Sequence, residues 1–304
     1  MCWRILRFNN NQQRIELKTK HCIYISILFA FLFVIIFLNW EYEIIAFNPF
    51  REEGGVELKV MTWNVHCSKG ADKIRQKKIA ELILKENANF VLLNEFNQDS
   101  CKIADSLLKV RYHYIEEGHS HKKSSDIFYS KYAISNSGRI KAPVKGFPFQ
   151  VIKTTIAVGR DSVQIFGVHL TSNQYDGSSW GKKNDLEKDS NLSLAKYKAG
   201  QEKRCSQAEW IGVEVLKSKH PVIVMGDMND FNQSKPLKIL TSYGLRDSWW
   251  EGGNGYGCTF HDGWLRLRID HILHSDKLKL YNIKVIDTNL SDHNPVIAGF
   301  SISK

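Results

Sequence analysis

The sequence PVIVMGDMND, residues 221–230, combines a short buried strand with an acidic turn. Four apolar residues in a row, 222–225, are typical of a strand that is covered on both faces. Gly226 interrupts the run, and Asp227, Asn229 and Asp230 follow where the strand ends. Asp and Asn are also ordinary turn formers. This stretch alone therefore does not separate a simple turn from a site for a metal, a water or a phosphate, and the rest of the chain decides.

The composition is that of a globular protein. The chain has 304 residues, of which 43% are hydrophobic and 24% are charged, which allows a sizeable core. The formal net charge of +10 is compatible with an anionic partner but does not identify one.

The six cysteines show no Cys-x-x-Cys or Cys/His ligand spacing. The sequence therefore predicts no structural zinc site. Four of them, Cys67, Cys101, Cys205 and Cys258, can pair in an oxidising compartment. Their pairing cannot be read from the sequence.

An apolar segment without charged residues, CIYISILFAFLFVIIFL, occupies residues 22–38. Its length is at the short end of what a helix needs to span about 30 Å of hydrocarbon. Basic residues precede it and acidic residues follow it, which predicts a single-pass membrane protein with a cytoplasmic N-terminus and an extracytoplasmic catalytic part. A cleaved signal peptide is the alternative. The predicted divisions are a basic tail at 1–21, a transmembrane signal-anchor at 22–40, a linker at 41–55 and a catalytic domain at 56–304.

From residue 56 onward, strand and helix patterns intermix, which predicts one α/β domain. Residues 56–65 read as a half-buried strand, and residues 74–88 have the periodicity of an amphipathic helix. Several strands between residues 125 and 172 follow one another without helices, so part of the sheet is expected to be antiparallel. The polar stretch 173–199 is predicted to be a long loop, either functional or disordered. We expect a monomer.

Polar side chains recur at the predicted strand ends. They are Asn64 in MTWNV, Glu95 in LLNEF, His169 in GVHLTS, Asp227 and Asn229 in GDMND, and Asp292 and His293 in LSDHNP, with Asp270 inside the strand RIDHIL. Each has an ordinary explanation alone, such as a turn cap, a surface charge or a hydrogen-bonded core histidine. Asp270 is harder to dismiss, because a carboxylate buried between isoleucines needs a partner. One shared site explains the set better than separate coincidences.

Three of these side chains offer hard oxygen ligands. Glu95, Asp292 and Asn64 suit Mg²⁺ or Mn²⁺ and do not suit zinc. Neither a GxSxG nucleophile elbow nor a Walker A motif is present, which disfavours a serine hydrolase and a P-loop enzyme.

The other side chains suit in-line attack of water on a phosphate ester. Asp227 can orient and deprotonate the water, and Asn229 can donate to a phosphoryl oxygen. His169 and His293 can donate to the phosphate or to the leaving group. Asp270 can hold His293 in one tautomer, as the orienting acid of a triad does.

The order TWNV, LLNEF, VHLT, GDMND, RIDHI, SDHNPV resembles the endonuclease/exonuclease/phosphatase superfamily over roughly residues 56–302. This superfamily includes deoxyribonuclease I, class II AP endonucleases, neutral sphingomyelinases and inositol-polyphosphate 5-phosphatases. The resemblance implies a two-sheet α/β sandwich of the deoxyribonuclease I-like type, with helices outside and the site at one edge of the sheets. It also implies site roles: a metal ligand at Glu95 with Asn64 and Asp292 beside it, phosphate binding and catalysis by His169, phosphate binding by Asn229, water activation by Asp227, and an Asp270–His293 pair.

Other residues refine the resemblance. His66 lies where AP endonucleases carry an acidic residue. Glu116 or Glu117 is a candidate to orient His169, and the sequence does not choose between them. Arg204 and Gln207 match a helix pattern common in the superfamily, with a solvated helix face as the alternative.

The substrate class stays open at this level. Nucleic acid is the first choice, because the histidine pair resembles that of deoxyribonuclease I. A membrane-proximal phospholipid or sphingomyelin phosphodiesterase and an inositol-phosphate phosphatase are the alternatives. An inactive binding module is remote, since every expected position is filled.

Overall fold

The computed structural model describes residues 24–39, 44–48, 55–67, 71–120, 124–142, 150–172 and 186–302. The chain divides into two compact units between Ile44 and Ile45. In the first unit, residues 24–39 form a helix whose side chains are nearly all exposed. No helix in the described ranges is long and apolar enough to cross a membrane, so the predicted transmembrane helix at 22–40 is not supported. The basic tail at 1–21 lies outside the described residues.

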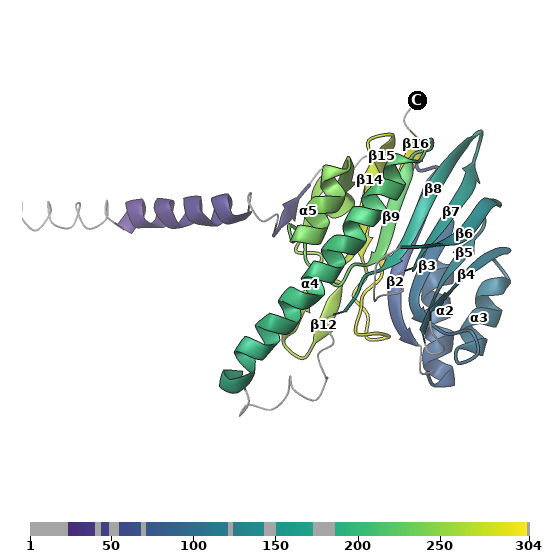
Figure 1. The fold of residues 1–304 in the computed structure, drawn as a ribbon, viewed down its shortest axis with the longest axis horizontal. Helices are drawn as coiled ribbons and strands as arrows, with labels where there is room; N and C mark the ends of the chain where they lie inside the picture. Colours follow the sequence, from purple (N-terminus) through teal and green to yellow (C-terminus); the bar gives the residue numbers. More distant parts are fainter. Residues whose placement is uncertain are drawn as a thin grey trace, which may run out of the picture. The chain divides into compact units, whose positions relative to one another are not determined.

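The second unit contains two six-stranded sheets that face each other (Figure 1). Sheet I has the order β15 (Leu278–Val285), β16 (Val296–Ile302), β2 (Leu58–Cys67), β3 (Phe90–Phe96), β5 (Ser124–Ser130) and β4 (Tyr114–Ser120). Sheet II has the order β10 (Leu245–Asp247), β14 (Asp270–Ser275), β9 (Val222–Asp227), β8 (Asp161–His169), β7 (Gln150–Val158) and β6 (Ile134–Lys141). The predicted two-sheet α/β sandwich is confirmed.

Strand β9 shows why the opening run is apolar throughout. Ile223 and Met225 point into the core between the sheets, and Val222 and Val224 point to the helices outside sheet II. Because successive side chains of a strand alternate between faces, covering both faces requires a continuous apolar run. The pairs β2–β3 and β8–β9 are parallel, and the remaining neighbours in both sheets are antiparallel.

Helices cover the outer faces of both sheets (Figure 1). The helices α2 (Lys73–Glu86) and α3 (Lys102–Lys109) pack on sheet I, and α4 (Leu186–Leu216) and α5 (Lys235–Ser242) pack on sheet II. Asp72 caps α2, because its side chain accepts hydrogen bonds from the backbone N–H groups of Ile74 and Arg75. The predicted loop at 173–199 is wrong from Leu186 onward, where α4 begins; residues 173–185 lie outside the described ranges.

Smaller elements complete the unit. Strand β1 (Ala46–Phe47) lies inside the predicted linker and pairs with β11 (Asn254–Gly255). The predicted strand LRIDHIL is two strands, β13 (Leu265–Leu267) and β14, and β13 forms a hairpin with β12 (Phe260–Asp262). A short helix, α6 (Ser248–Gly252), follows β10.

A disulfide joins Cys67 to Cys101, and Cys205 and Cys258 are free. Such a bond is typical of proteins in oxidising compartments. The extracytoplasmic location stays a prediction.

Gly226 has a structural reason for its place in GDMND. Its φ is +142°, and a Cβ built there would lie 1.9 Å from the backbone oxygen of Val168 on β8. Because that neighbour is backbone, it cannot turn away as a flexible side chain can.

We expect Gly226→Ala to lower the free energy of unfolding by about 1–3 kcal/mol, measured by urea denaturation. Gly138→Ala is the matched control, since no atom lies within 4 Å of its Cβ position; an equal loss in both variants would contradict the explanation.

Candidate active site

The predicted site residues meet at one edge of the two sheets. In sheet II, Asp227 lies opposite His169 of the parallel strand β8 and opposite Asp270 of the antiparallel strand β14. In sheet I, β2 and β3 run parallel and carry Asn64 and Glu95 at their carboxyl ends. Asn64 joins the sheets, because its Nδ2 atom lies 3.0 Å from Asp227 Oδ2 and 3.2 Å from Glu95 Oε1.

Three residues at this edge have left-handed backbone conformations: His66 with φ 43°, Glu95 with φ 53° and Asn229 with φ 50°. Non-glycine residues adopt this region rarely and at an energetic cost. The fold holds these residues there, where the strands end and the side chains turn toward the site.

Asp227 occupies the centre of the site and is 2% exposed. Its Oδ1 accepts a hydrogen bond from the backbone N–H of Asn229 at 2.8 Å. Its Oδ2 lies 3.7 Å from His169 Nε2 and 3.9 Å from His293 Nε2. These two distances exceed hydrogen-bond length, so both imidazoles face the carboxylate without engaging it.

His293 is oriented by Asp270, as the sequence predicts. The Nδ1 of His293 lies 2.8 Å from Asp270 Oδ2, and Asp270 is buried. Burial lowers the pKa of His293, but the charges of Asp270 and Asp227 outweigh it and raise that pKa to about 9. Among the residues that the structure describes, Asp270 Oδ1 has no hydrogen-bond partner. The imidazole is therefore held in place as a charged donor whose Nε2 faces Asp227.

His169 lies close to a carboxylate that the sequence did not single out. Its Nδ1 lies 3.6 Å from Asp126 Oδ1, and Asp126 in turn accepts a hydrogen bond from Asn94 Nδ2 at 2.9 Å. Burial lowers the pKa of His169, but the nearby Asp126 carboxylate, with the charges of Asp227 and Glu95, raises it to about 10.

Asp126 was missed because its role depends on the position of β5 in sheet I. The nearest sequence signal is an acidic residue directly before the apolar run IFY, Ile127–Tyr129. Among the described residues, no hydrogen bond or ion pair joins Glu116 to His169. The side chain of Glu117 lies outside the described residues, so this candidate stays a prediction.

The predicted cation ligands have the donor chemistry that a divalent cation requires. The side chains of Glu95 and Asp292 are 27% and 35% exposed, so each is accessible to a cation. Asn64 is buried beside Glu95. All their ligand atoms are oxygens, which suits Mg²⁺ or Mn²⁺. Four carboxylates, Glu95, Asp227, Asp270 and Asp292, also crowd this edge of the sheets, and a cation would offset their charge.

A second grouping also has metal-like spacing. Among the residues that the structure describes, the ligand atoms of Asp227, Asp270 and His293 all lie within 4.8 Å of one another. His293 Nδ1 is already bonded to Asp270, and the two oxygens of Asp227 accept from Asn229 and Asn64. We therefore retain Glu95, Asn64 and Asp292 as the predicted ligands.

His66 is a second residue whose contact the sequence did not reveal. Its Nδ1 lies 3.1 Å from Asp292 Oδ2. Burial raises the pKa of Asp292, but the hydrogen bond from His66 and the charges of both nearby histidines lower it to about 2. Asp292 is thus anionic at neutral pH, as a cation ligand must be.

Behind the site, α4 anchors the loop that follows β9. Arg204 is fully buried and its Nε lies 2.9 Å from Asp230 Oδ2. Gln207 bonds both the backbone N–H and the hydroxyl of Thr171, close to His169. The alternative that Arg204 and Gln207 belong to a solvated helix face is wrong.

Asn229 Nδ2 donates to Leu170 O at 3.0 Å, which leaves one of its N–H bonds for a phosphate.

The motif order and this geometry agree with a comparison against protein families. The model of the endonuclease/exonuclease/phosphatase family matches residues 61–293. The chain belongs to this family. Its members hydrolyse phosphoester bonds, so this endonuclease/exonuclease/phosphatase protein is an enzyme of that class.

Solved structures of family members share the fold. A mannosyl-6-phosphatase of Bacteroides thetaiotaomicron matches with TM-score 0.62 and 17% identity, covering 81% of this chain and 100% of that one. D. rerio TDP2 complexed with a single-strand DNA product matches with TM-score 0.60 and 16% identity, covering 80% and 98%. The 3'-5' exonuclease NExo of Neisseria meningitidis matches with TM-score 0.59 and 20% identity, covering 80% and 100%. At these identities the likeness establishes the fold alone. No curated protein gave a significant match.

Proposed function

We propose that this protein is a Mg²⁺-dependent phosphoester hydrolase that cleaves nucleic acid by direct attack of a water activated by Asp227. The observation that carries the proposal is the position of Asp227. It is a buried carboxylate that two oriented imidazoles face from 3.7 and 3.9 Å, just beyond hydrogen-bond range. A water can therefore donate to the carboxylate and accept from either imidazole at the same time.

The site residues then have separate tasks. Asp227 accepts the proton of the attacking water, since its carboxylate is the central group of the site. His293, held by Asp270, and His169, held by Asp126, donate to the phosphoryl oxygens or to the leaving oxygen. Asn229 donates its remaining N–H to the phosphate. A divalent cation bound by Glu95, Asn64 and Asp292 would neutralise phosphate charge. In this scheme no covalent intermediate forms.

Two observations support nucleic acid as the substrate. The net charge of +10 suits a polyanion. TDP2 and NExo, which share the fold, have structures with DNA products bound. The mannosyl-6-phosphatase, with the same fold, makes small phosphomonoesters the competing class.

A substrate panel tests the proposal. We expect Mg²⁺-dependent release of products from single-stranded or plasmid DNA, with weaker or no hydrolysis of RNA, sphingomyelin, inositol phosphates and mannose 6-phosphate. Excess EDTA should abolish the activity, and added Mg²⁺ or Mn²⁺ should restore it. Asp227→Asn is the control for contaminating nucleases. Hydrolysis of lipid or sugar phosphates alone would contradict the nucleic-acid assignment, and full activity in EDTA would contradict the metal requirement.

A further inference from the structure

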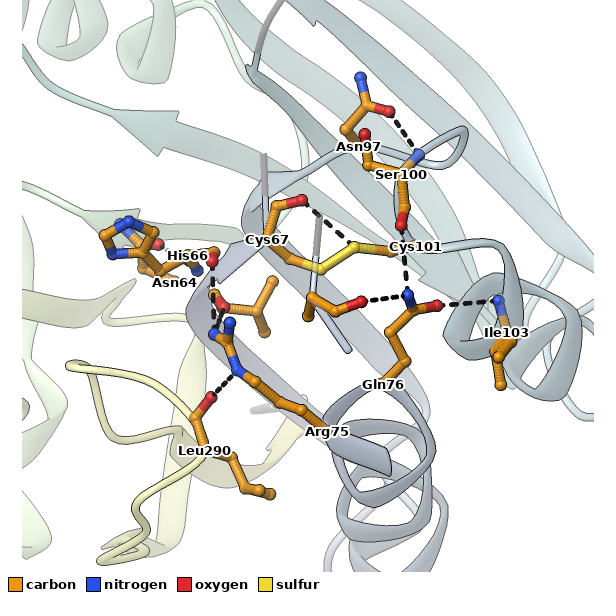
Figure 2. The surroundings of a disulfide bond; sticks show 12 residues. Asn64, His66, Cys67, Arg75, Gln76, Asn97, Ser100, Cys101, Ile103 and Leu290 are labelled. Atoms are coloured by element: carbon orange, nitrogen blue, oxygen red, sulfur yellow. Dashed lines mark hydrogen bonds between the residues drawn. A yellow bond between two sulfur atoms is a disulfide. The ribbon is translucent and has the colours of Figure 1, made fainter. Parts of the chain in front are cut away.

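Two adjacent side chains in the first turn of α2, Arg75 and Gln76, make hydrogen bonds to the chain segments beside the predicted cation ligands (Figure 2). The guanidinium of Arg75 donates hydrogen bonds to three backbone carbonyls. Its Nε donates to Leu290 O at 2.5 Å, and its Nη2 donates to Val65 O at 2.6 Å and to His66 O at 3.3 Å. Val65 directly follows Asn64, and Leu290 lies two residues before Asp292. One side chain thus links the backbones beside two predicted ligands.

Gln76, the next residue, is buried and reaches the third segment. Its Nε2 donates to Ala71 O at 2.7 Å and to Ser100 O at 3.2 Å, and its Oε1 accepts from the backbone N–H of Ile103 at 3.0 Å. Ser100 and Ile103 lie in the turn and helix that follow Glu95. The Cys67–Cys101 disulfide ties the end of β2 to this same turn (Figure 2).

Asn64 and Glu95 lie on the paired strands β2 and β3, but regular structure supports the three ligand-bearing segments only in part. The β2–β3 pairing shifts register between Asn64 and Cys67, and Glu95 has a positive φ. Residues 286–295, which carry Asp292, form no helix or strand, and His293 makes only an isolated bridge to Phe260. Backbone bonds such as His261 N–H to Asp292 O at 2.9 Å and side-chain bonds such as Ser291 Oγ to Asn64 O at 2.8 Å also hold these segments, and α2 adds contacts that reach all three of them.

The contacts of Arg75 are with backbone carbonyls. Within the described residues, no carboxylate lies at ion-pair distance from it. The planar guanidinium presents several N–H groups in a fixed arrangement, whereas a lysine ammonium is a single point on a flexible stem. The geometry therefore requires an arginine, and not only a positive charge.

We propose that Arg75, assisted by Gln76, is a positioning residue that sets the distance between the predicted cation ligands Asn64, Glu95 and Asp292. It does not touch the cation or the substrate; it acts through the backbones that carry the ligands. Partners that orient metal ligands typically change metal affinity about 10–100-fold when removed. This inference rests on the cation site of the proposed function.

The test is cation binding without substrate. We expect Arg75→Ala to weaken Mn²⁺ binding, measured by isothermal titration calorimetry, by about 10–100-fold. The Mn²⁺ concentration that gives half-maximal activity should rise by the same factor, while KM at saturating Mn²⁺ stays unchanged. Arg75→Lys keeps the charge but loses the fixed set of guanidinium N–H donors, so this variant should also bind Mn²⁺ more weakly. Gln76→Met should act in the same direction, and Lys77→Ala, whose side chain is 66% exposed on the same helix, should match the wild type.

The outcomes separate the inference from the proposed function. Wild-type Mn²⁺ affinity in folded Arg75→Ala or Arg75→Lys would overturn the inference, as would a wild type that binds no Mn²⁺. If Arg75→Ala does not fold, as judged by circular dichroism, Arg75→Lys decides. A wild type that binds Mn²⁺ through Arg75-dependent ligands but hydrolyses no phosphoester would overturn the proposed function and leave the inference standing.

Discussion

Replacing His293 with alanine is expected to lower kcat by about 10²–10⁴, the usual contribution of a positioned general acid or base. The reason is geometric. His293 Nε2 faces Asp227 at 3.9 Å, and Asp270 holds the ring through Nδ1 at 2.8 Å. No other described side chain occupies that position, so water would have to replace the lost donor. Steady-state kinetics on the best substrate of the panel, at saturating Mg²⁺, measures the change.

Two further variants make this result specific. Asp270→Asn keeps the shape of the pair but removes the charge that orients the imidazole, so kcat should also fall. His220→Ala removes an exposed histidine that precedes β9 at the end of the strand opposite to Asp227, and it should leave kcat unchanged. His293 also packs its ring against Phe260 at 4.9 Å between centroids, so urea denaturation must show that His293→Ala is folded. Near wild-type kcat in folded His293→Ala would contradict the mechanism.

The part of the site that could be predicted depends on strand ends. Asp227, His169 and Glu95 each end an apolar run, and the carboxyl ends of parallel strands meet at one edge of a sheet. The Asp270–His293 pair could be expected because a buried carboxylate requires a partner. In these cases the neighbouring residues in the sequence were sufficient to predict the place of the side chain in the site.

The residues that were missed are those whose role depends on register between distant segments. Asp126 approaches His169 only because β5 pairs with β3 in one register, which places it beside Asn94. His66 reaches Asp292 across 226 positions of sequence. The Cys67–Cys101 disulfide depends on the turn after β3. No local pattern encodes these distances.

One segment prediction was wrong for a physical reason, and another is not supported by the structure. The start of α4 was read as a loop because residues 186–199 lack an apolar stripe, although Leu, Glu, Lys and Ala there favour a helix. The segment at 22–38 was read as a membrane span on apolar composition. The structure gives a helix at 24–39, and no helix within the described residues is both long and apolar enough for a span.

Loss of the Asp247 carboxylate is expected to be the most destabilising of these substitutions. Its Oδ2 accepts a 2.8 Å hydrogen bond from Arg268 Nη1, and the Arg268 side chain is only 2% exposed. Its Oδ1 caps α6 by accepting the N–H of Trp249. Asp247→Ala leaves a buried guanidinium without its counter-charge, which costs about 3–5 kcal/mol of the free energy of unfolding. Urea denaturation at pH 7 measures it.

Controls separate the buried pair from surface charge and assign the pH range. Glu81→Ala breaks the exposed Lys77–Glu81 pair and should cost at most about 0.5 kcal/mol.

Burial raises the pKa of Asp247, but the charge of Arg268 and the hydrogen bond from His271 hold it well below its usual value. For a lowered pKa, the stabilisation is fully present above the unfolded value of about 4 and is lost as pH falls below it. The stability difference between wild type and Asp247→Asn should therefore stay constant from about pH 7 to pH 5 and shrink only under about pH 4. A difference that already declines near pH 6 would contradict the assignment of this titration to Asp247.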